Sequence, residues 1–377
     1  MSSDTSQALT SIVVLCYNGL EHTTIPCLES ILANTTAGAY ELIVVDNASS
    51  DGTPEYLTSL SQGHPHIRLQ LNDTNRGYAG GNNDGIRLAS GNCIILLNND
   101  TLVPHGWLDP LLHILDTQPQ IGLVSPVTNS AGNEQRIDLP LLNETNFEQL
   151  ADRYILAQQG HWFTTSKLGF FCVAMRRSLI DEVGLLDEKF GIGMFEDDDF
   201  CVRVMEKGYR LAVAECCFVY HKGSASFKKL NAADLAETFQ NNRDYFYQKH
   251  AKYWVFSDIA TAIWRKINDD LELYLIRKDV AALERISARR TNLSDALMQL
   301  KEVELASGTV GDESLNKIQL AEKHKQLMEM SDWSVGLKRA NEQLTAELAT
   351  KNDQLKAARA YLNSPLHRLI KWIKKRK

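Results

Sequence analysis

Short apolar runs alternate with segments of helical periodicity over the first hundred residues. Each apolar run is closed by polar or turn-forming residues, as is typical of buried strands. The predicted strands are Ser11–Cys16, Glu41–Val45, His66–Leu71 and Cys93–Leu97. The predicted helices between them are Glu21–Asn34, Thr53–Leu60 and Gly81–Ala89. Strands that alternate with helices in this way favour an α/β fold with a mainly parallel sheet.

Polar side chains gather where three of these predicted strands end. The clusters are Tyr17-Asn18, Asp46-Asn47 and Asn99-Asp100. In open α/β sheets, ligands bind in the crevice outside the carboxyl ends of the strands. The pattern therefore predicts a binding site at this edge of the sheet.

The middle of the chain, from about 121 to 227, mixes strand and helix signals. Two further strands are predicted at Leu168–Met175 and Leu211–His221, and two helices at Ser178–Val183 and Phe200–Lys207. From about 231 onward the composition is almost entirely helical. We therefore expect an α/β domain over 1–230 and a helical extension over 231–300.

The C-terminal part of the chain carries a leucine repeat and then a basic tail. Leucines at 337, 344, 348, 355 and 362 follow a heptad-like spacing. This spacing favours a coiled coil over 301–362, which would join the chain to a second copy or to a partner, although a long surface helix gives the same pattern. The segment 363–377 interleaves apolar and basic residues, which is typical of an amphipathic membrane-surface anchor. A solubilising tail or a docking site for an acidic partner is the alternative.

Composition and charge restrict the class of protein. Apolar residues make up 44% and charged residues 23% of the 377 residues, as in a soluble globular protein. The net charge of −7 argues against binding nucleic acid through the whole surface. The N-terminus lacks the pattern of a signal peptide, and no apolar run is long enough to span a membrane. Seven cysteines without metal spacing indicate reduced thiols, so we expect a cytoplasmic protein.

Four consecutive acidic residues, Glu196–Asp199, are the most unusual feature of the sequence. They lie within an apolar stretch that runs from Phe190 to Val204. Adjacent carboxylates repel one another unless a cation, a substrate or solvent relieves the charge. One interpretation is a functional site. The other is an acidic start of the following helix, where negative charge is favourable.

Several motifs, in this order, resemble those of the inverting family 2 glycosyltransferases, which have the GT-A fold, a Rossmann-like nucleotide-diphospho-sugar fold. The resemblance covers roughly 11–227. Its motifs are Ile43–Thr53, the Gly-rich Asn75–Asn83, the D-x-D-like Leu96–Thr101 with asparagine in place of the first aspartate, Gly184–Phe190, Glu196-Asp197 with Arg203, and Tyr220-His221. Each motif is weak alone, but the ordered combination is specific.

The resemblance implies a glycosyltransferase of the hexosyl or deoxyhexosyl type, acting in polysaccharide or glycoconjugate synthesis. Asp197 would be the general base, with Glu196 orienting it or the acceptor. Asp100, the best candidate ligand at a strand end, and His221 would hold Mg²⁺ or Mn²⁺. The expected donor-binding residues are Tyr17, Asn18, Asp46, Asn47, Asn75, Gly77, Asn99 and Asp100.

The expected partners are a nucleotide-diphospho-sugar, such as a UDP- or dTDP-sugar, and a saccharide or lipid-linked acceptor. A lipid-linked acceptor would place the protein at the inner face of the membrane. Two other classes stay open: a nucleotidyltransferase, and a coiled-coil scaffold that only binds a nucleotide-sugar. The first strand is not followed by the basic Gly-rich loop that a nucleotidyltransferase normally has. Arg203 would pair with an acid or a phosphate, or form a structural ion pair.

Overall fold

The computed structural model describes residues 9–223 apart from 37 and 140, then 232–250, 258–277, 279, 281–282, 284–289, 292 and 295. All of them belong to the first of two units, Met1–Val303 and Glu304–Lys377, into which the chain divides. The expected coiled coil over 301–362 and the tail over 363–377 lie outside the described residues. Within the described part, none of the helices combines the length and the apolar character that crossing a bilayer requires.

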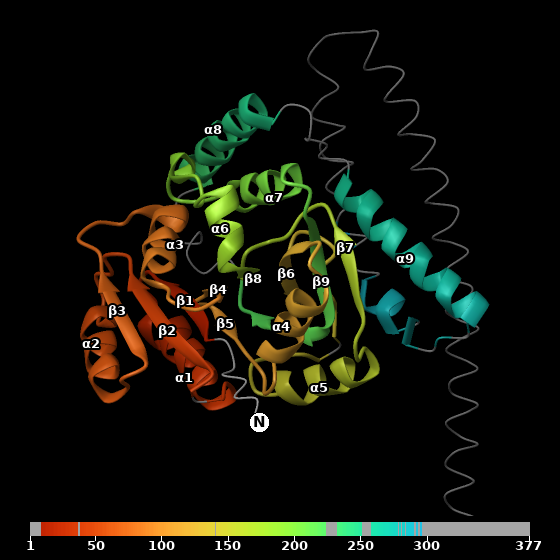
Figure 1. Cartoon of the computed structure of the whole chain (residues 1–377), viewed down its shortest axis with the longest axis horizontal. Helices are drawn as coiled ribbons and strands as arrows, with labels where there is room; N and C mark the ends of the chain where they lie inside the picture. The colour runs from red at the N-terminus through yellow and green to blue at the C-terminus, as the bar shows by residue number, and fades with distance from the viewer. Residues whose placement is uncertain are drawn as a thin grey trace, which may run out of the picture. The chain divides into compact units, whose positions relative to one another are not determined.

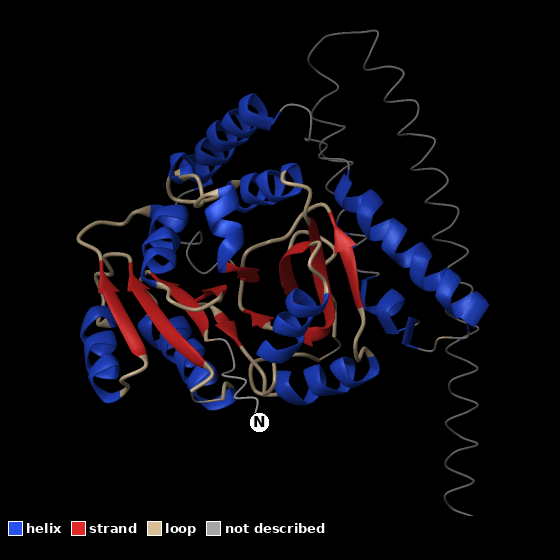
Figure 2. Ribbon diagram, in the orientation of Figure 1, coloured by secondary structure: helices blue, strands red, loops and turns tan. Residues whose placement is uncertain are grey.

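One mixed sheet forms the centre of the described structure (Figures 1 and 2). Its strand order is β3-β2-β1-β4-β8-β6-β9-β7. The strands are β1 (Thr10–Cys16), β2 (Tyr40–Asp46), β3 (Ile67–Leu71), β4 (Cys93–Asn98), β6 (Ile121–Val127), β7 (Trp162–Thr165), β8 (Cys172–Arg176) and β9 (Arg210–Phe218). Only β7 and β8 run against the others, so the predicted mainly parallel sheet is confirmed. A short antiparallel pair joins β5 (Thr101–Leu102) to β10 (Tyr220–His221).

Helices cover both faces of this sheet (Figure 1). They are α1 (Ile25–Asn34), α2 (Thr53–Gly63), α3 (Gly77–Leu88), α4 (Leu108–Thr117), α5 (Phe147–Ala157), α6 (Arg177–Val183), α7 (Glu196–Glu206), α8 (Ala232–His250) and α9 (Asp258–Arg277). Residues of α1, α2 and α4 join one apolar cluster, and residues of α3, α6 and α7 join the other. Successive strand residues divide between the clusters: Ile12 and Val14 face the first, and Val13 faces the second. Both faces are buried, which is why these strands read as continuous apolar runs.

Three predicted boundaries were wrong. Helix α3 begins at Gly77 rather than at Gly81, since much of the expected Gly-rich loop is helical. At Gly81 a Cβ would lie 2.3 Å from Leu15 Cδ1, so this glycine lets α3 pack closely on β1. Helix α7 begins at Glu196, so the whole acidic run is its first turn. The strand expected from Leu168 begins only at Cys172.

The cysteines are free thiols. Six of the seven are buried, and Cys93 is half-buried. Cys216 and Cys217 lie on β9 within the apolar core.

A buried cluster of charges connects β9 to residues far along the chain. Glu215 on β9 has no solvent-exposed surface. Its Oε1 lies 2.5 Å from Arg289 Nη1, and its Oε2 lies 3.4 Å from Lys266 Nζ on α9 and 3.6 Å from Arg285 Nε. Burial alone would raise the pKa of Glu215, but Arg289 and Lys266 hold that pKa far below its usual range. Residues of the predicted helical extension, 231–300, therefore neutralise the charge of Glu215 inside the sheet.

Replacing Glu215 with alanine is expected to destabilise the protein by about 3–5 kcal/mol, because the fully buried Arg289 loses its counter-ion. Urea unfolding of the wild type and the variant at pH 7 measures the difference. Glu55 is exposed on α2, so Glu55→Ala is the matched control and should change stability by less than about 0.5 kcal/mol. Equal stability of Glu215→Ala and the wild type would show that the cluster does not stabilise the fold.

Candidate active site

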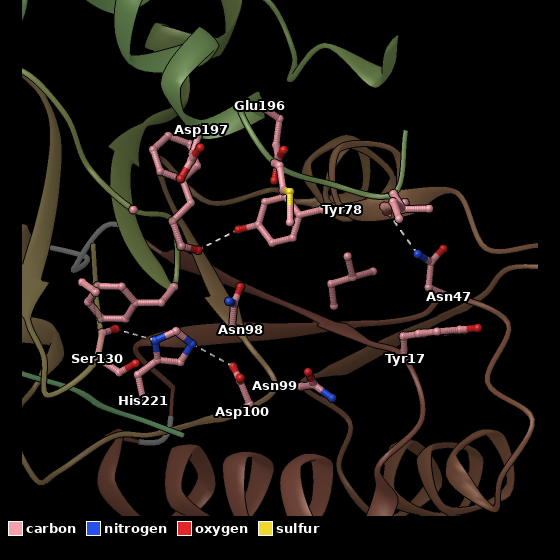
Figure 3. A pocket seen from close by; sticks show the side chains of 18 of the residues that line it. Tyr17, Asn47, Tyr78, Asn98, Asn99, Asp100, Ser130, Glu196, Asp197 and His221 are labelled. Carbon is pink, nitrogen blue, oxygen red and sulfur yellow. Dashed lines mark hydrogen bonds and ion pairs between the residues drawn. The ribbon is translucent and has the colours of Figure 1, made fainter. Parts of the chain in front are cut away.

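A cavity of about 400 Å³ opens at the carboxyl edge of the parallel strands. The ends of β1, β2 and β4 supply one side of its wall, and the start of α7 and the segment before it supply another (Figure 3). The lining residues come from segments that lie far apart in the sequence. They are Leu15, Tyr17, Asn47, Asn75, Gly77, Tyr78, Asn98, Asn99, Asp100, Ser130, Ala131, Gly132, Gly169, Phe170, Phe171, Ile192, Met194, Glu196, Asp197 and His221.

The structure brings most of the expected site residues together in this cavity. Those that line it are Tyr17, Asn47, Asn75, Gly77, Asn99, Asp100, Glu196, Asp197 and His221. Asn18 and Asp46 do not line it. Their side chains shape the neighbouring turn, because Asn18 Oδ1 accepts a hydrogen bond from the Ser50 amide at 2.8 Å and Asp46 Oδ2 accepts one from the Ser49 amide at 3.0 Å.

Asp100 and His221 meet at one end of the cavity (Figure 3). The β5–β10 pair positions them, since Thr101 lies opposite His221 in its register. His221 Nε2 is 3.2 Å from Asp100 Oδ1, and His221 Nδ1 is 2.8 Å from the carbonyl oxygen of Ser130. Burial by itself would lower the pKa of His221, but its bonds to Asp100 and Ser130 raise it.

This pair has the chemistry of a partial cation site. The Ser130 carbonyl can only accept, so Nδ1 carries a proton and a neutral imidazole turns its Nε2 lone pair toward the Asp100 carboxylate. Two acceptors at this distance repel unless a proton or a cation lies between them. A carbonyl behind the second ring nitrogen is also the usual support of a metal-binding histidine. Among the described residues, no group of three or more His, Cys, Asp or Glu side chains could hold a metal, so further ligands must come from elsewhere.

Glu196 and Asp197 lie across the cavity, at the start of α7 (Figure 3). Burial, followed by the charge of Asp198, raises the pKa of Asp197 to about 6. Burial, followed by the charge of Asp197, raises the pKa of Glu196 well above its usual range. Like-charge coupling was the reason expected from the sequence, but burial is the larger cause. The structure thus provides a carboxylate that gains and loses its proton near neutrality.

The other two acids of the run have structural partners. Asp198 pairs with Lys167, whose Nζ is 2.8 Å from Asp198 Oδ1. Asp199 is fully buried and accepts from Arg203 Nε at 2.8 Å. Arg203 also donates to the carbonyl of Val183. The structural reading of Arg203 is therefore the right one, and the acidic run is both a helix start and part of the cavity wall.

The amide side chains of Asn47 and Asn75 form hydrogen bonds in the wall of the cavity next to the start of α3. Asn47 Nδ2 donates to Asn75 Oδ1 at 2.8 Å and to the Gly77 carbonyl at 3.1 Å, while Asn47 Oδ1 accepts from the Arg76 amide. Gly77 has φ of 70°, and a Cβ there would lie 1.8 Å from the Gly191 carbonyl oxygen. Only glycine fits at this position, where the start of α3 touches the segment before α7.

Several lining residues escaped the sequence reasoning. Tyr78 donates its hydroxyl to the Phe170 carbonyl at 2.6 Å, and Phe171 stacks on His221 with ring centroids 5.3 Å apart. Ser130 belongs to a segment, 128–162, in which no motif stands out. Tyr78 lies inside the Gly-rich motif Asn75–Asn83, and this position was the signal in the sequence that could have placed it in the site.

Comparison with known proteins assigns the class of this domain. Residues 11–184 match the family described as glycosyl transferase family 2. The match covers slightly less than half of the chain, and it confirms the class of enzyme that the motifs implied, a glycosyltransferase. The mixed α/β sheet described above is the GT-A arrangement expected for this class.

Individual proteins are more distant. The uncharacterized protein y4gI of Sinorhizobium fredii is 26% identical over 246 residues, which are 62% of this chain and 26% of y4gI. The succinoglycan biosynthesis protein ExoO of Rhizobium meliloti is 26% identical over 248 residues, covering 64% of this chain and 68% of ExoO. A crystal structure of GalNAc-T7 with UDP, GalNAc and Mn²⁺ is 16% identical, has a TM-score of 0.48 and covers 68% of this chain and 54% of that one. The chain thus spans only about a quarter of the length of y4gI.

Proposed function

We propose that the protein is a divalent-cation-dependent, inverting glycosyltransferase. It would move a hexosyl or deoxyhexosyl group from a UDP- or dTDP-sugar to a saccharide or lipid-linked saccharide during polysaccharide synthesis. One observation carries the proposal: a single cavity has the Asp100–His221 pair on one side and Asp197, with its raised pKa, on the other. The similarity to ExoO, a succinoglycan biosynthesis protein, supports the polysaccharide context.

The donor would lie along the ends of β1, β2 and β4. Tyr17, 39% exposed at the mouth, offers a ring face to a base. Among the described residues, Asp46 Oδ1 is buried without a hydrogen-bond partner, so it can accept from a base or ribose of the donor with little movement. Asp100 and His221 would hold the divalent cation together with the diphosphate oxygens. When bound, such a cation neutralises the charge that develops on the departing diphosphate.

The acceptor would enter on the side of α7. Asp197 removes the proton of the acceptor hydroxyl while that oxygen forms a bond to the anomeric carbon. The bond from that carbon to the diphosphate oxygen breaks, and its electron pair leaves with the diphosphate. This single displacement inverts the anomeric configuration. Glu196, kept protonated by burial, donates a hydrogen bond to the acceptor, and its Oε2 has no partner among the described residues.

The C-terminal part of the proposal rests on sequence alone. The leucine repeat over 301–362 would join the chain to a second copy or a partner. The basic segment 363–377 would hold the enzyme at an anionic membrane surface, on the cytoplasmic side, where a lipid-linked acceptor lies.

The first expected outcome concerns the donor. The purified protein, incubated with Mg²⁺ or Mn²⁺ and a panel of UDP-, dTDP- and GDP-sugars, should release nucleoside diphosphate from one class of donor. Water replaces the acceptor slowly in this reaction, so hydrolysis reports the activity before the acceptor is known. Release of pyrophosphate from a sugar phosphate and a nucleoside triphosphate would instead indicate a nucleotidyltransferase. Binding without turnover of any donor would indicate a scaffold.

Asp197→Asn is expected to lower turnover by about 10²–10⁴-fold while the affinity for the donor stays the same, because only the base is lost. Steady-state kinetics and calorimetric titration of the donor separate the two quantities. Asp234, exposed at the start of α8, gives the matched control Asp234→Asn, which should keep wild-type turnover. Near-native turnover of Asp197→Asn would remove Asp197 from this role.

The wild-type kcat/KM is expected to fall about tenfold per pH unit below about pH 6, where Asp197 becomes protonated. Above that pH the base is ionised and the profile should flatten. Burial is the largest cause of this raised pKa, followed by the charge of Asp198, while Lys167 lowers the pKa. The acid limb should disappear from the residual activity of Asp197→Asn. An acid limb near the ordinary aspartate pKa of about 4 would contradict the assignment.

Asp100→Ala is expected to weaken binding of the nucleoside diphosphate when Mn²⁺ is present but to change it little in excess chelator. The reason is that Asp100 would act on the diphosphate through the cation. Calorimetric titrations with and without EDTA measure the four affinities, and Asp109→Ala on α4 is the control. Full turnover of the wild type in excess chelator would shift the stabilisation of charge onto basic side chains.

A further inference from the structure

The loop Gly191–Phe195, just before the acidic pair, has an unusual backbone. Four of its five residues have positive φ: Gly191 (65°), Gly193 (143°), Met194 (77°) and Phe195 (73°). Glycine adopts such angles freely, whereas each non-glycine residue in this region costs about 1–3 kcal/mol. Such a conformation persists only where the surrounding structure holds it.

This loop sets the direction in which α7 begins. Ile192 and Met194 line the cavity, and Phe195 is the residue that precedes the first turn of α7. The Phe195 carbonyl accepts the first bond of the helix from the Asp199 amide at 2.9 Å. Asp197 follows Phe195 by two residues, so a change in the loop would move its carboxylate relative to the cavity.

One side chain outside the cavity contacts three carbonyls around this loop. Asn242 on α8 is buried, and its Nδ2 lies 2.8 Å from the Phe190 oxygen, 2.8 Å from the Gly193 oxygen and 3.2 Å from the Met194 oxygen. Since carbonyls only accept, the amide nitrogen must face the loop. A single side chain thereby connects both ends of the strained segment to one helix.

Helix α8 is itself fixed to α7 on both sides of Asn242. The Phe195 ring packs against Phe239, with centroids 5.1 Å apart, and against Phe246 at 5.9 Å. Near the end of the helix, His250 Nε2 lies 2.7 Å from Asp199 Oδ1. The helix that carries Asn242 is therefore held on both sides of this residue: by the ring of Phe195 at the end of the loop, and by Asp199, which lies beyond the loop.

We infer that Asn242 is a positioning residue of the active site: its bonds to the loop hold Glu196 and Asp197 in the orientation in which they face the cavity. The catalytic part of this inference rests on the proposed function. It assigns a role to a residue that touches neither the cavity nor the acids, on a helix that begins beyond the family match.

The kinetic test uses the full chain with Asn242→Ala and Asn242→Asp. Asn242→Asp keeps the shape but turns a carboxylate oxygen toward the carbonyls, so its effect should be the larger. We expect kcat to fall by about 10²-fold, as for a misplaced catalytic group, while the donor KM stays within about twofold, because the donor residues lie on other elements. The adjacent Asn241 is exposed, and Asn241→Ala should match the wild type in both constants.

A second measurement does not depend on activity. Hydrogen exchange at the Gly193 and Asp199 amides should be faster in Asn242→Ala than in the wild type and unchanged in Asn241→Ala. Unchanged exchange overturns the inference whether or not the enzyme is active. Faster exchange with an unchanged kcat shows a merely structural role and also overturns it. A wild type that turns over no donor overturns the proposed function and the catalytic part of the inference, while the exchange result still decides whether Asn242 holds the loop.

Discussion

Neutralising the charge of four adjacent carboxylates is the constraint on which the site depends. The first turn of α7 is too crowded for every acid to stay ionised without a partner. Lys167 balances Asp198, and Arg203 with Lys249 balances the fully buried Asp199. These ion pairs bring the segment before β8, the body of α7 and the end of α8 to one place. Among the described residues, neither Glu196 nor Asp197 has a cation within ion-pair distance, and both of them line the cavity.

The local pattern of apolar and polar residues predicted the part of the sheet that the first hundred residues form. Strands β1, β2 and β4 are short apolar runs followed by polar residues, and these strand ends line the cavity as expected. The structure between β5 and β8 was hardly predicted, because strand β7 and the segment after β6 have no periodicity that separates them from loops. The start of α7 was placed four residues late, since acidic residues suit both a loop and the first turn of a helix. Asn18 and Asp46 stand at strand ends, but their side chains turn back to the neighbouring backbone.

The Asp100–His221 pair could not be predicted from the periodicity of apolar residues along the chain. Asp100 ends one motif and His221 ends another, and the short β5–β10 ladder joins them. The segment after β6 orients the imidazole, because Asn129 accepts from the His221 amide while Ser130 accepts from its ring. Each of these contacts links segments far apart in the chain. Only the resemblance to a family, which carries the record of such contacts, placed His221 at the site.

The buried carboxylate of Glu215 makes the chain beyond the family match indispensable to the sheet. The match ends at residue 184, yet the anion in β9 is balanced by Lys266 and Arg289. Without the helical segment, this carboxylate would keep, among the described residues, only His161, whose Nδ1 lies 2.9 Å from Glu215 Oε2, as a basic partner. In a related sequence, an acidic residue at this strand position therefore calls for a basic group packed behind the sheet.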